Sequence, residues 1–331
     1  MKKIIFLIIS VLIISSCGAL FICAESDKDD YYSIDYDEEF KWESYKYSDS
    51  ISLPYFMYVP KDYDESKEYP VVIVLQRAGK DEKSSRETML ELVPYLFTNS
   101  NREAYESIVI AAQSPVDMGW GYGYGDDYET DSAKALIGLV GMLDQNYSIN
   151  RDKIYLIGAS MGGYGVWDLL IRHNNVFAAG ITICAGADAS KAEILKDTPI
   201  YVFHGDEDTV VLPREARNMV DAIRAAGSKK IQYVEYRKLG HEIWDDAMVT
   251  SGLLDWLFAQ KLSNRYPEVL KEGFAEIAQV DQSTAAVHKI STAAKWAVVG
   301  TSTVIVCAAA VVALVFYIIT LRRKKKLINK R

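Results

Sequence analysis

Residues 153–167 read KIYLIGASMGGYGVW and decide the fold of this chain. The run at 153–157 is short and apolar, which is typical of a strand buried on both faces. Gly158-Ala159-Ser160-Met161-Gly162 then has the spacing G-x-S-x-G, and 162–173 has the pattern of a helix. Such a tight strand-to-helix turn presents the serine hydroxyl at the carboxyl edge of a sheet and needs small neighbours. The backbone N–H of Met161, at the helix start, can point at a developing oxyanion. We predict Ser160 as a nucleophile, although G-x-S-x-G also occurs by chance in turns.

Apolar runs and helical patterns alternate on both sides of this turn. Runs typical of strands lie at 53–60, 71–75, 108–112, 153–157, 178–184, 200–203 and 231–236. Helical patterns lie at 130–145, 162–173, 214–226 and 252–261. Strands that alternate with helices favour a parallel sheet covered on both faces, so the predicted fold class is α/β with a mostly parallel sheet.

A serine hydroxyl is a weak nucleophile and needs a general base, usually histidine. The chain has four histidines. His288 lies in the predicted stalk at 263–295, His173 ends a predicted helix, and His204 ends a strand as a predicted structural turn residue. His241 follows a strand and Gly240, C-terminal to the rest of the core, which fits the chain order serine, acid, histidine. We therefore predict His241 as the base.

The acid that orients the base should lie on a loop between Ser160 and His241. Residues 204–210 read HGDEDTV and offer three carboxylates on such a loop. Asp208 is favoured, Asp206 is the alternative, and the residues by themselves leave Glu207 open.

Four motifs together resemble a known family. They are GASMGGYGVWD at 158–168, FAAGITICAGAD at 177–188, PIYVFHGDEDTVV at 199–211 and LGHEIWD at 239–245. Over roughly residues 53–261 the chain is similar to the prolyl-oligopeptidase-like esterases often labelled "predicted peptidase", which are close to feruloyl esterases and polyhydroxybutyrate-depolymerase-like proteins. The resemblance implies an α/β-hydrolase fold without a cofactor. It also implies Asp208 as the acid, through the pattern HG-x-x-D-x-V, and His241 as the base, through GH-x-x-W.

The chain departs from that family directly after the strand at 71–75. The family usually has a turn containing His-Gly there, whose backbone supplies the second oxyanion donor, whereas this chain reads Gln76-Arg77-Ala78-Gly79. The N–H of Ala78 or Arg77 remains a candidate donor. Arginine in place of glycine alters the turn, because glycine tolerates backbone conformations that arginine does not. The Arg77 side chain is expected either to bind an anionic group of the substrate or to lie in solvent. Loss of one oxyanion donor typically costs about 100–1,000-fold in rate.

Aromatic residues near the predicted site point to a substrate class. Residues 119–125 read GWGYGYG and follow a predicted strand, which places them near the active-site edge. Aromatic faces stack on sugars and phenolic acids, which favours small or carbohydrate-linked esters; alternatively, the rings pack on the loop itself. The predicted substrate contacts are Trp120, Tyr122, Tyr124 and Trp244.

The two ends of the chain predict a membrane protein. Residues 1–24 have two lysines before an apolar run and resemble a signal peptide, with lipidation of Cys17 or an uncleaved anchor as alternatives. Residues 296–321 are 26 uncharged residues, long enough to span a bilayer as a helix, and a buried core helix is the alternative. The basic residues of 322–331 should stay cytoplasmic, which predicts a single-pass type I protein with an extracytoplasmic domain.

Charge and cysteine usage exclude other classes of protein. The net charge is −8, and the basic residues gathered at both ends leave an acidic body, which argues against nucleic-acid binding. Cys184 is the only cysteine between the apolar segments, so we expect neither a disulfide framework nor a metal cluster. The predicted order is an acidic, Tyr-rich lead-in at 25–50 that is flexible or loosely packed, a catalytic domain at 51–262 and a helical stalk at 263–295.

The sequence thus supports a membrane-anchored carboxylesterase with Ser160, His241 and Asp208 as its triad. A serine peptidase is the rival among enzymes, because the same triad serves both reactions. A catalytically silent binding protein is the rival from another class, and the change at Gln76-Arg77 is the one feature that favours it.

Overall fold

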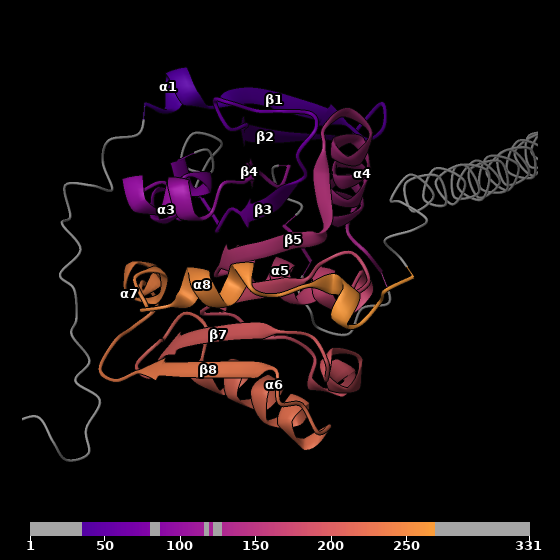
Figure 1. The fold of residues 1–331 in the computed structure, drawn as a ribbon. Helices are drawn as coiled ribbons and strands as arrows, with labels where there is room; N and C mark the ends of the chain where they lie inside the picture. Colours follow the sequence, from indigo (N-terminus) through magenta and orange to yellow (C-terminus); the bar gives the residue numbers. More distant parts are fainter. Residues whose placement is uncertain (1–34, 80–86, 116–118, 122–127, 269–331) are drawn as a thin grey trace, which may run out of the picture.

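The computed structural model describes residues 35–79, 87–115, 119–121 and 128–268. These residues contain an eight-stranded sheet in the order β1-β2-β4-β3-β5-β6-β7-β8 (Figure 1). The strands are β1 Lys41–Lys46, β2 Ser52–Tyr58, β3 Tyr69–Leu75, β4 Ile108–Ala112, β5 Ile149–Ala159, β6 Ala179–Ile183, β7 Ile200–Gly205 and β8 Ile231–Tyr236. The β2 strand is antiparallel to both of its neighbours, and the six strands from β4 to β8 in the sheet order are parallel. The predicted mostly parallel sheet is confirmed.

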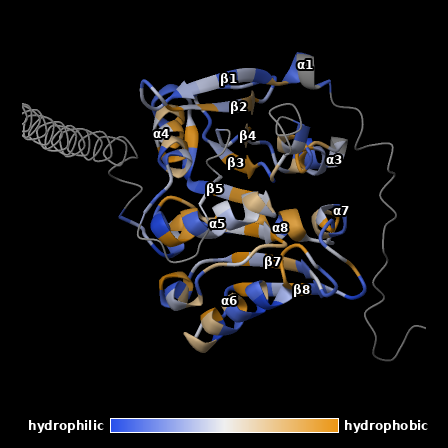
Figure 2. Ribbon diagram, turned by 180° about the vertical axis from the view of Figure 1, so that it is seen from behind, coloured by the Kyte–Doolittle hydropathy of each residue, from blue (hydrophilic) through white to orange (hydrophobic). Residues whose placement is uncertain are grey.

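Helices cover both faces of this sheet. They are α1 Tyr36–Glu39, α3 Asn99–Ala104, α4 Asp131–Asn146, α5 Met161–Arg172, α6 Pro213–Ala225, α7 Trp244–Met248 and α8 Leu253–Phe258, with short 3-10 turns at Pro94–Leu96, Ala189–Leu195 and Leu262–Asn264. Side chains of β3 alternate between the faces: Val71 and Ile73 pack in the cluster of α4, α5 and α6, whereas Val72 and Val74 pack in that of α7 and α8. Figure 2 shows hydrophobic residues concentrated on the central strands and hydrophilic residues along α6. Continuous apolar runs in the sequence thus correspond to strands buried on both faces.

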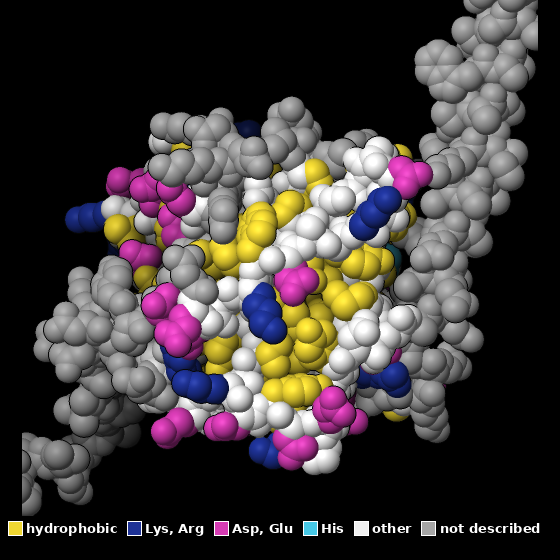
Figure 3. Space-filling model, turned by 90° about the horizontal axis from the view of Figure 1, so that it is seen from above, with side chains coloured by type: hydrophobic (Ala, Val, Ile, Leu, Met, Phe, Trp, Pro, Cys, Tyr) yellow, Lys and Arg dark blue, Asp and Glu magenta, His cyan; other side chains and the backbone are white. Residues whose placement is uncertain are grey.

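The prediction of a flexible or loosely packed lead-in is partly wrong. Within 25–50, the described part contains α1 and β1, and β1 pairs with β2 from Lys41 opposite Met57 to Lys46 opposite Ser52. Most β1 side chains are exposed, so the strand lacks the apolar alternation that would reveal it, and backbone pairing carries much of its attachment. Trp42, 43% exposed, packs edge-on against Phe56. Figure 3, viewed from the β1 side, shows hydrophobic side chains gathered in the middle of that face.

The predicted closing helix at 252–261 is shorter than expected. The structure has α8 at Leu253–Phe258, preceded by α7 at Trp244–Met248, a helix that the sequence pattern did not predict. Gly252 separates the two with a left-handed φ of 73°, a conformation that glycine adopts without strain.

Among residues 35–268, as far as they are described, no helix has both the length and the apolar character needed to span a bilayer. The predicted signal segment, the membrane helix, the basic tail and all of the predicted stalk after Glu268 lie outside the described residues, and so does His288. The predictions for these segments therefore remain predictions.

Candidate active site

Ser160 occupies the predicted turn between β5 and α5. Its backbone has φ 52° and ψ −120°, which is strained for a residue other than glycine. The Ser160 N–H donates to Ile183 O at 2.8 Å, and the Ser160 carbonyl accepts from Tyr164 N at 3.0 Å. The parallel strands β5, β7 and β8 end at one edge of the sheet, where α7 also lies (left in Figure 1), so Ser160 sits at that carboxyl edge.

The turn closes only because glycines flank the serine. A Cβ on Gly158 would lie 2.3 Å from Gly162 O, and a Cβ on Gly162 would lie 2.2 Å from Leu75 O. Both obstacles are backbone atoms, which cannot rotate away as a side chain can. The glycine spacing of the motif is therefore a packing requirement of the β5–α5 turn against the end of β3.

Gly162→Ala should destabilise the protein by about 1–3 kcal/mol, because the new methyl group forces β3 and α5 apart. Denaturant unfolding followed by tryptophan fluorescence measures this change. Gly240→Ala is the matched control, because a Cβ at Gly240 meets no heavy atom within 4 Å, and its effect should stay within about 0.5 kcal/mol. Equal stability of the two variants would contradict the packing argument.

The structure brings Ser160, His241 and Asp208 into one chain of hydrogen bonds. His241 Nε2 lies 2.9 Å from Ser160 Oγ, and His241 Nδ1 lies 2.8 Å from Asp208 Oδ2. A carboxylate only accepts, so the Nδ1–H donates to Asp208 and Nε2 is left to accept the serine proton. This is the tautomer that a general base next to a serine requires.

Asp208 is almost completely buried yet remains ionised. Its Oδ1 accepts from the backbone N–H groups of Val210, at 2.8 Å, and Val211, at 3.0 Å. Burial by itself raises the pKa of Asp208, but the hydrogen bonds from His241, Val211 and Val210 outweigh burial and hold that pKa below its ordinary value. The carboxylate is thus available to stabilise an imidazolium at His241.

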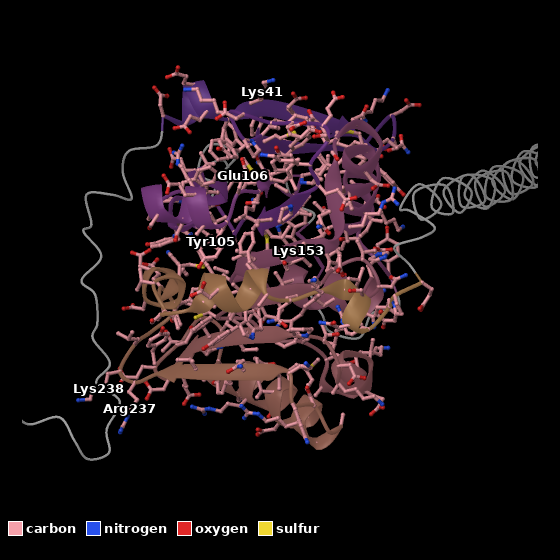
Figure 4. All side chains as sticks on the ribbon, in the orientation of Figure 1. Lys41, Tyr105, Glu106, Lys153, Arg237 and Lys238 are labelled. Carbon is pink, nitrogen blue, oxygen red and sulfur yellow. The ribbon has the colours of Figure 1, made fainter. Side chains whose placement is uncertain are left out.

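The other two carboxylates of this loop lie elsewhere. Asp206 Oδ1 accepts from the backbone N–H of Lys238 at 2.6 Å, which binds it to the loop after β8. Figure 4 shows Lys238 and Arg237 at the outer end of β8. Glu207 is exposed to solvent. Of the three acids left open by the sequence, Asp208 is the one that contacts His241.

Cys184, His204 and Asp208 form a cluster with metal-ligating atoms, and those atoms lie within 4.8 Å of one another. A metal ion bound to all three would compete with His241 for the Asp208 carboxylate, whose oxygens already accept hydrogen bonds. The donor set therefore fits a hydrogen-bonding role around the acid better than a metal site.

The two segments that carry the predicted oxyanion donors lie side by side at the start of α5. Met161 opens α5, where the first N–H groups have no acceptor within the helix. The close approach of Gly162 to Leu75 O and Gln76 O places the end of β3 beside that helix start. Ala78 and Arg77 follow directly, so the two remaining candidate donors lie on the segment next to Met161.

The Arg77 side chain does not lie free in solvent, as one of the two expectations had it. Its Nε and Nη2 donate to the two oxygens of Glu91, at 2.5 and 2.8 Å, and its guanidinium lies 4.9 Å from the ring centroid of Trp244. The hydrogen bonds to Glu91 raise the pKa of Arg77, and burial opposes them. Arg77 is thus a partly buried structural contact that fixes the segment after β3.

Of the four aromatic residues predicted to contact substrate, the structure describes two. Trp120 is fully buried, donates its indole N–H to Gln76 O at 3.2 Å and packs against Gly165 of α5, so its prediction as a substrate contact is wrong. It instead supports the segment that carries the candidate oxyanion donors Arg77 and Ala78. Trp244 packs edge-on against His241 with centroids 5.9 Å apart and is 7% exposed. Tyr122 and Tyr124 lie outside the described residues.

Comparisons with known proteins show similarity to esterases. Residues 128–251 match the phospholipase/carboxylesterase family model. A thermostable esterase of known structure is 28% identical, with a TM-score of 0.60 over 68% of this chain, and the chain spans 63% of that esterase. No curated protein matches the chain.

Two structures with lower identity share the fold. A ferulic acid esterase is 17% identical, with a TM-score of 0.52 over 66% of this chain and 98% of its own. A feruloyl esterase module from Clostridium thermocellum, in complex with sinapinate, is 13% identical, with a TM-score of 0.51 over 70% of this chain and 91% of its own. These findings show that the chain has the α/β-hydrolase fold, and that the segment carrying Ser160, Asp208 and His241 is similar to phospholipases and carboxylesterases.

Proposed function

We propose that this protein is a serine carboxylesterase that acts through an acyl-enzyme. The observation that carries the proposal is the unbroken chain of hydrogen bonds from Ser160 Oγ through His241 to Asp208. An imidazole held between a carboxylate and a serine in this way activates the serine hydroxyl, which is otherwise a weak nucleophile.

The reaction follows from the positions of these groups. His241 Nε2 takes the Ser160 proton as Oγ bonds to the ester carbonyl carbon, and Asp208 stabilises the resulting imidazolium. Backbone N–H groups at Met161 and on the segment 77–78 stabilise the oxyanion. His241 then gives its proton to the leaving alcohol. Water attacks the acyl-enzyme with His241 again as base, and the acid leaves as Oγ regains its proton.

The proposed substrates are small or carbohydrate-linked esters. The 28% identical thermostable esterase supports ester hydrolysis. The carbohydrate-linked class rests on the Tyr- and Gly-rich stretch at 119–125, where Tyr122 and Tyr124 remain the candidates for stacking on a sugar or phenolic ring.

Turnover of two substrates distinguishes an esterase from a peptidase. We expect the purified protein to hydrolyse p-nitrophenyl acetate and to leave a proline-containing peptide nitroanilide intact, with absorbance of the released chromophore as the measurement. Ser160→Ala corrects for hydrolysis that does not use the site. Faster cleavage of the peptide would support a peptidase, and absence of both activities would support a silent binding protein.

We also propose that the catalytic domain lies outside the cytoplasm, anchored by the segment at 296–321. The charge pattern supports this proposal: 26 uncharged residues precede the basic residues at 322–326. A fluorophosphonate probe that cannot cross membranes should label Ser160 on intact cells. Labelling only after the cells are opened would argue against this orientation.

A further inference from the structure

The Asp208 carboxylate lies between two histidines, and only one of them belongs to the triad. His204, near the end of β7, has its Nε2 3.2 Å from Asp208 Oδ2, the same oxygen that accepts from His241 Nδ1 at 2.8 Å. His204 Nε2 also lies 2.9 Å from Val211 O. The imidazole is fully buried, so these contacts are made without competition from bulk solvent.

The contacts define the tautomer of His204. A backbone carbonyl can only accept, so Nε2 must carry the hydrogen that Val211 O and Asp208 Oδ2 share. His204 Nδ1 is buried and has no hydrogen-bond partner among the described residues, so a proton there would be unpaired. Burial lowers the pKa of His204, against the opposing effect of Val211 and Asp208, and this also favours the neutral form.

His204, Val211 and Asp208 are linked to one another in a ring of contacts. Asp208 Oδ1 accepts from Val210 and Val211, while the carbonyl of Val211 accepts from His204. The Cys184 thiol lies in the same cluster, and burial raises its pKa, so it stays protonated. Glu235 of β8 is the residue paired with His204 in the register of the two strands, and its carboxylate accepts a hydrogen bond from Arg217.

We infer that His204 is a positioning residue of the triad. The His204 Nε2–H holds Oδ2 of Asp208 in place. The same N–H also holds Val211 O, and thereby the loop whose backbone N–H groups bind Oδ1 of Asp208. The carboxylate therefore has one orientation, with Oδ2 aimed at His241. This inference rests on the proposed esterase function, since it assigns His204 a role in that reaction.

Three substitutions test the inference with full-length protein. His204→Gln keeps a neutral N–H donor near the position of Nε2, whereas His204→Asn carries its amide nearer to the position of Nδ1, and His204→Leu carries no donor. We expect kcat to fall by roughly 10–100-fold in the Leu and Asn variants with little change in KM, because a small misplacement of the acid misaligns the base. The Gln variant should recover most of the activity.

The pH profile separates positioning from mere packing. A carboxylate that has lost one donor attracts the His241 proton more strongly, so the acid limb of kcat/KM should move to higher pH in His204→Leu and His204→Asn. It should stay in place in His204→Gln. A purely structural role would lower the melting temperature without moving that limb in the folded enzyme. If the Leu variant does not fold, the Gln and Asn pair still decides the question.

His173→Gln is the matched control, because His173 pairs with Glu129 at 2.5 Å outside the triad and should give a wild-type profile. Wild-type kcat and an unmoved acid limb in His204→Asn would overturn the inference. Failure of the proposed function looks different: wild-type protein would then neither hydrolyse esters nor react with a fluorophosphonate at Ser160.

Discussion

Ser160→Ala should lower kcat for ester hydrolysis by roughly 10⁵–10⁶-fold, the scale on which loss of the nucleophile acts in serine hydrolases. Alanine keeps the Cβ and the strained backbone at φ 52°, so the variant removes the nucleophilic atom and one hydrogen bond to His241. The β5–α5 turn should therefore persist. Steady-state kinetics with p-nitrophenyl acetate and intact mass after fluorophosphonate treatment measure the loss of turnover and of covalent labelling.

Ser190→Ala provides the control for this experiment. Ser190 is exposed and donates its hydroxyl to Asp188 at 2.8 Å, so it has a carboxylate partner but no histidine. Activity and labelling should match wild type, and both variants should unfold within about 1 kcal/mol of it. Labelling that persists in Ser160→Ala would place the reactive group elsewhere and remove the basis of the proposed function.

The parts of the fold that the sequence predicts are those where burial and backbone geometry leave a local pattern. Val71–Leu75 and Ile108–Ala112 are buried on both faces and therefore read as continuous apolar runs. The β5–α5 turn is visible because Gly158 and Gly162 are needed to close it. By contrast, β1 is an exposed edge strand whose attachment depends on backbone pairing, and no side-chain period marks it.

The site was predictable where a residue's role depends on its type and its order in the chain, and not where it depends on which side chains it contacts in the folded protein. The order of Ser160, Asp208 and His241 needs only the topology of the sheet. Two contacts depend on how the loops fold back onto the sheet: the pairing of Arg77 with Glu91 and the burial of Trp120. The sequence therefore left the position of the Arg77 side chain open, and it led to the wrong prediction that Trp120 contacts substrate. The contact between Asp208 and His204 could have been suspected, because His204-Gly205 directly precedes the loop that carries Asp208. Only the distance from His204 Nε2 to Asp208 Oδ2 in the structure reveals it.

The choice among the three loop carboxylates leads to the second large expected effect. Asp208→Asn should lower kcat by about 10⁴-fold, because an amide can donate to His241 Nδ1 and so favour the tautomer that cannot take the serine proton. Asp206→Asn is the matched control on the same loop. Its side-chain oxygen can still accept from Lys238 N, and we expect activity to change by less than about threefold.

Stability against pH gives Asp208→Asn an independent readout. The folded-state pKa of Asp208 is lowered, so ionised Asp208 stabilises the fold at pH values above its unfolded-state pKa of about 3.9. That contribution is lost as the pH falls through the folded-state value. The difference in unfolding free energy between wild type and Asp208→Asn should therefore be largest near neutrality and shrink in acid, as measured by urea titrations at several pH values. A larger loss of activity in Asp206→Asn, or a stability difference independent of pH, would show that Asp208 is not the acid that holds His241, because a buried carboxylate paired with the imidazole must produce both effects.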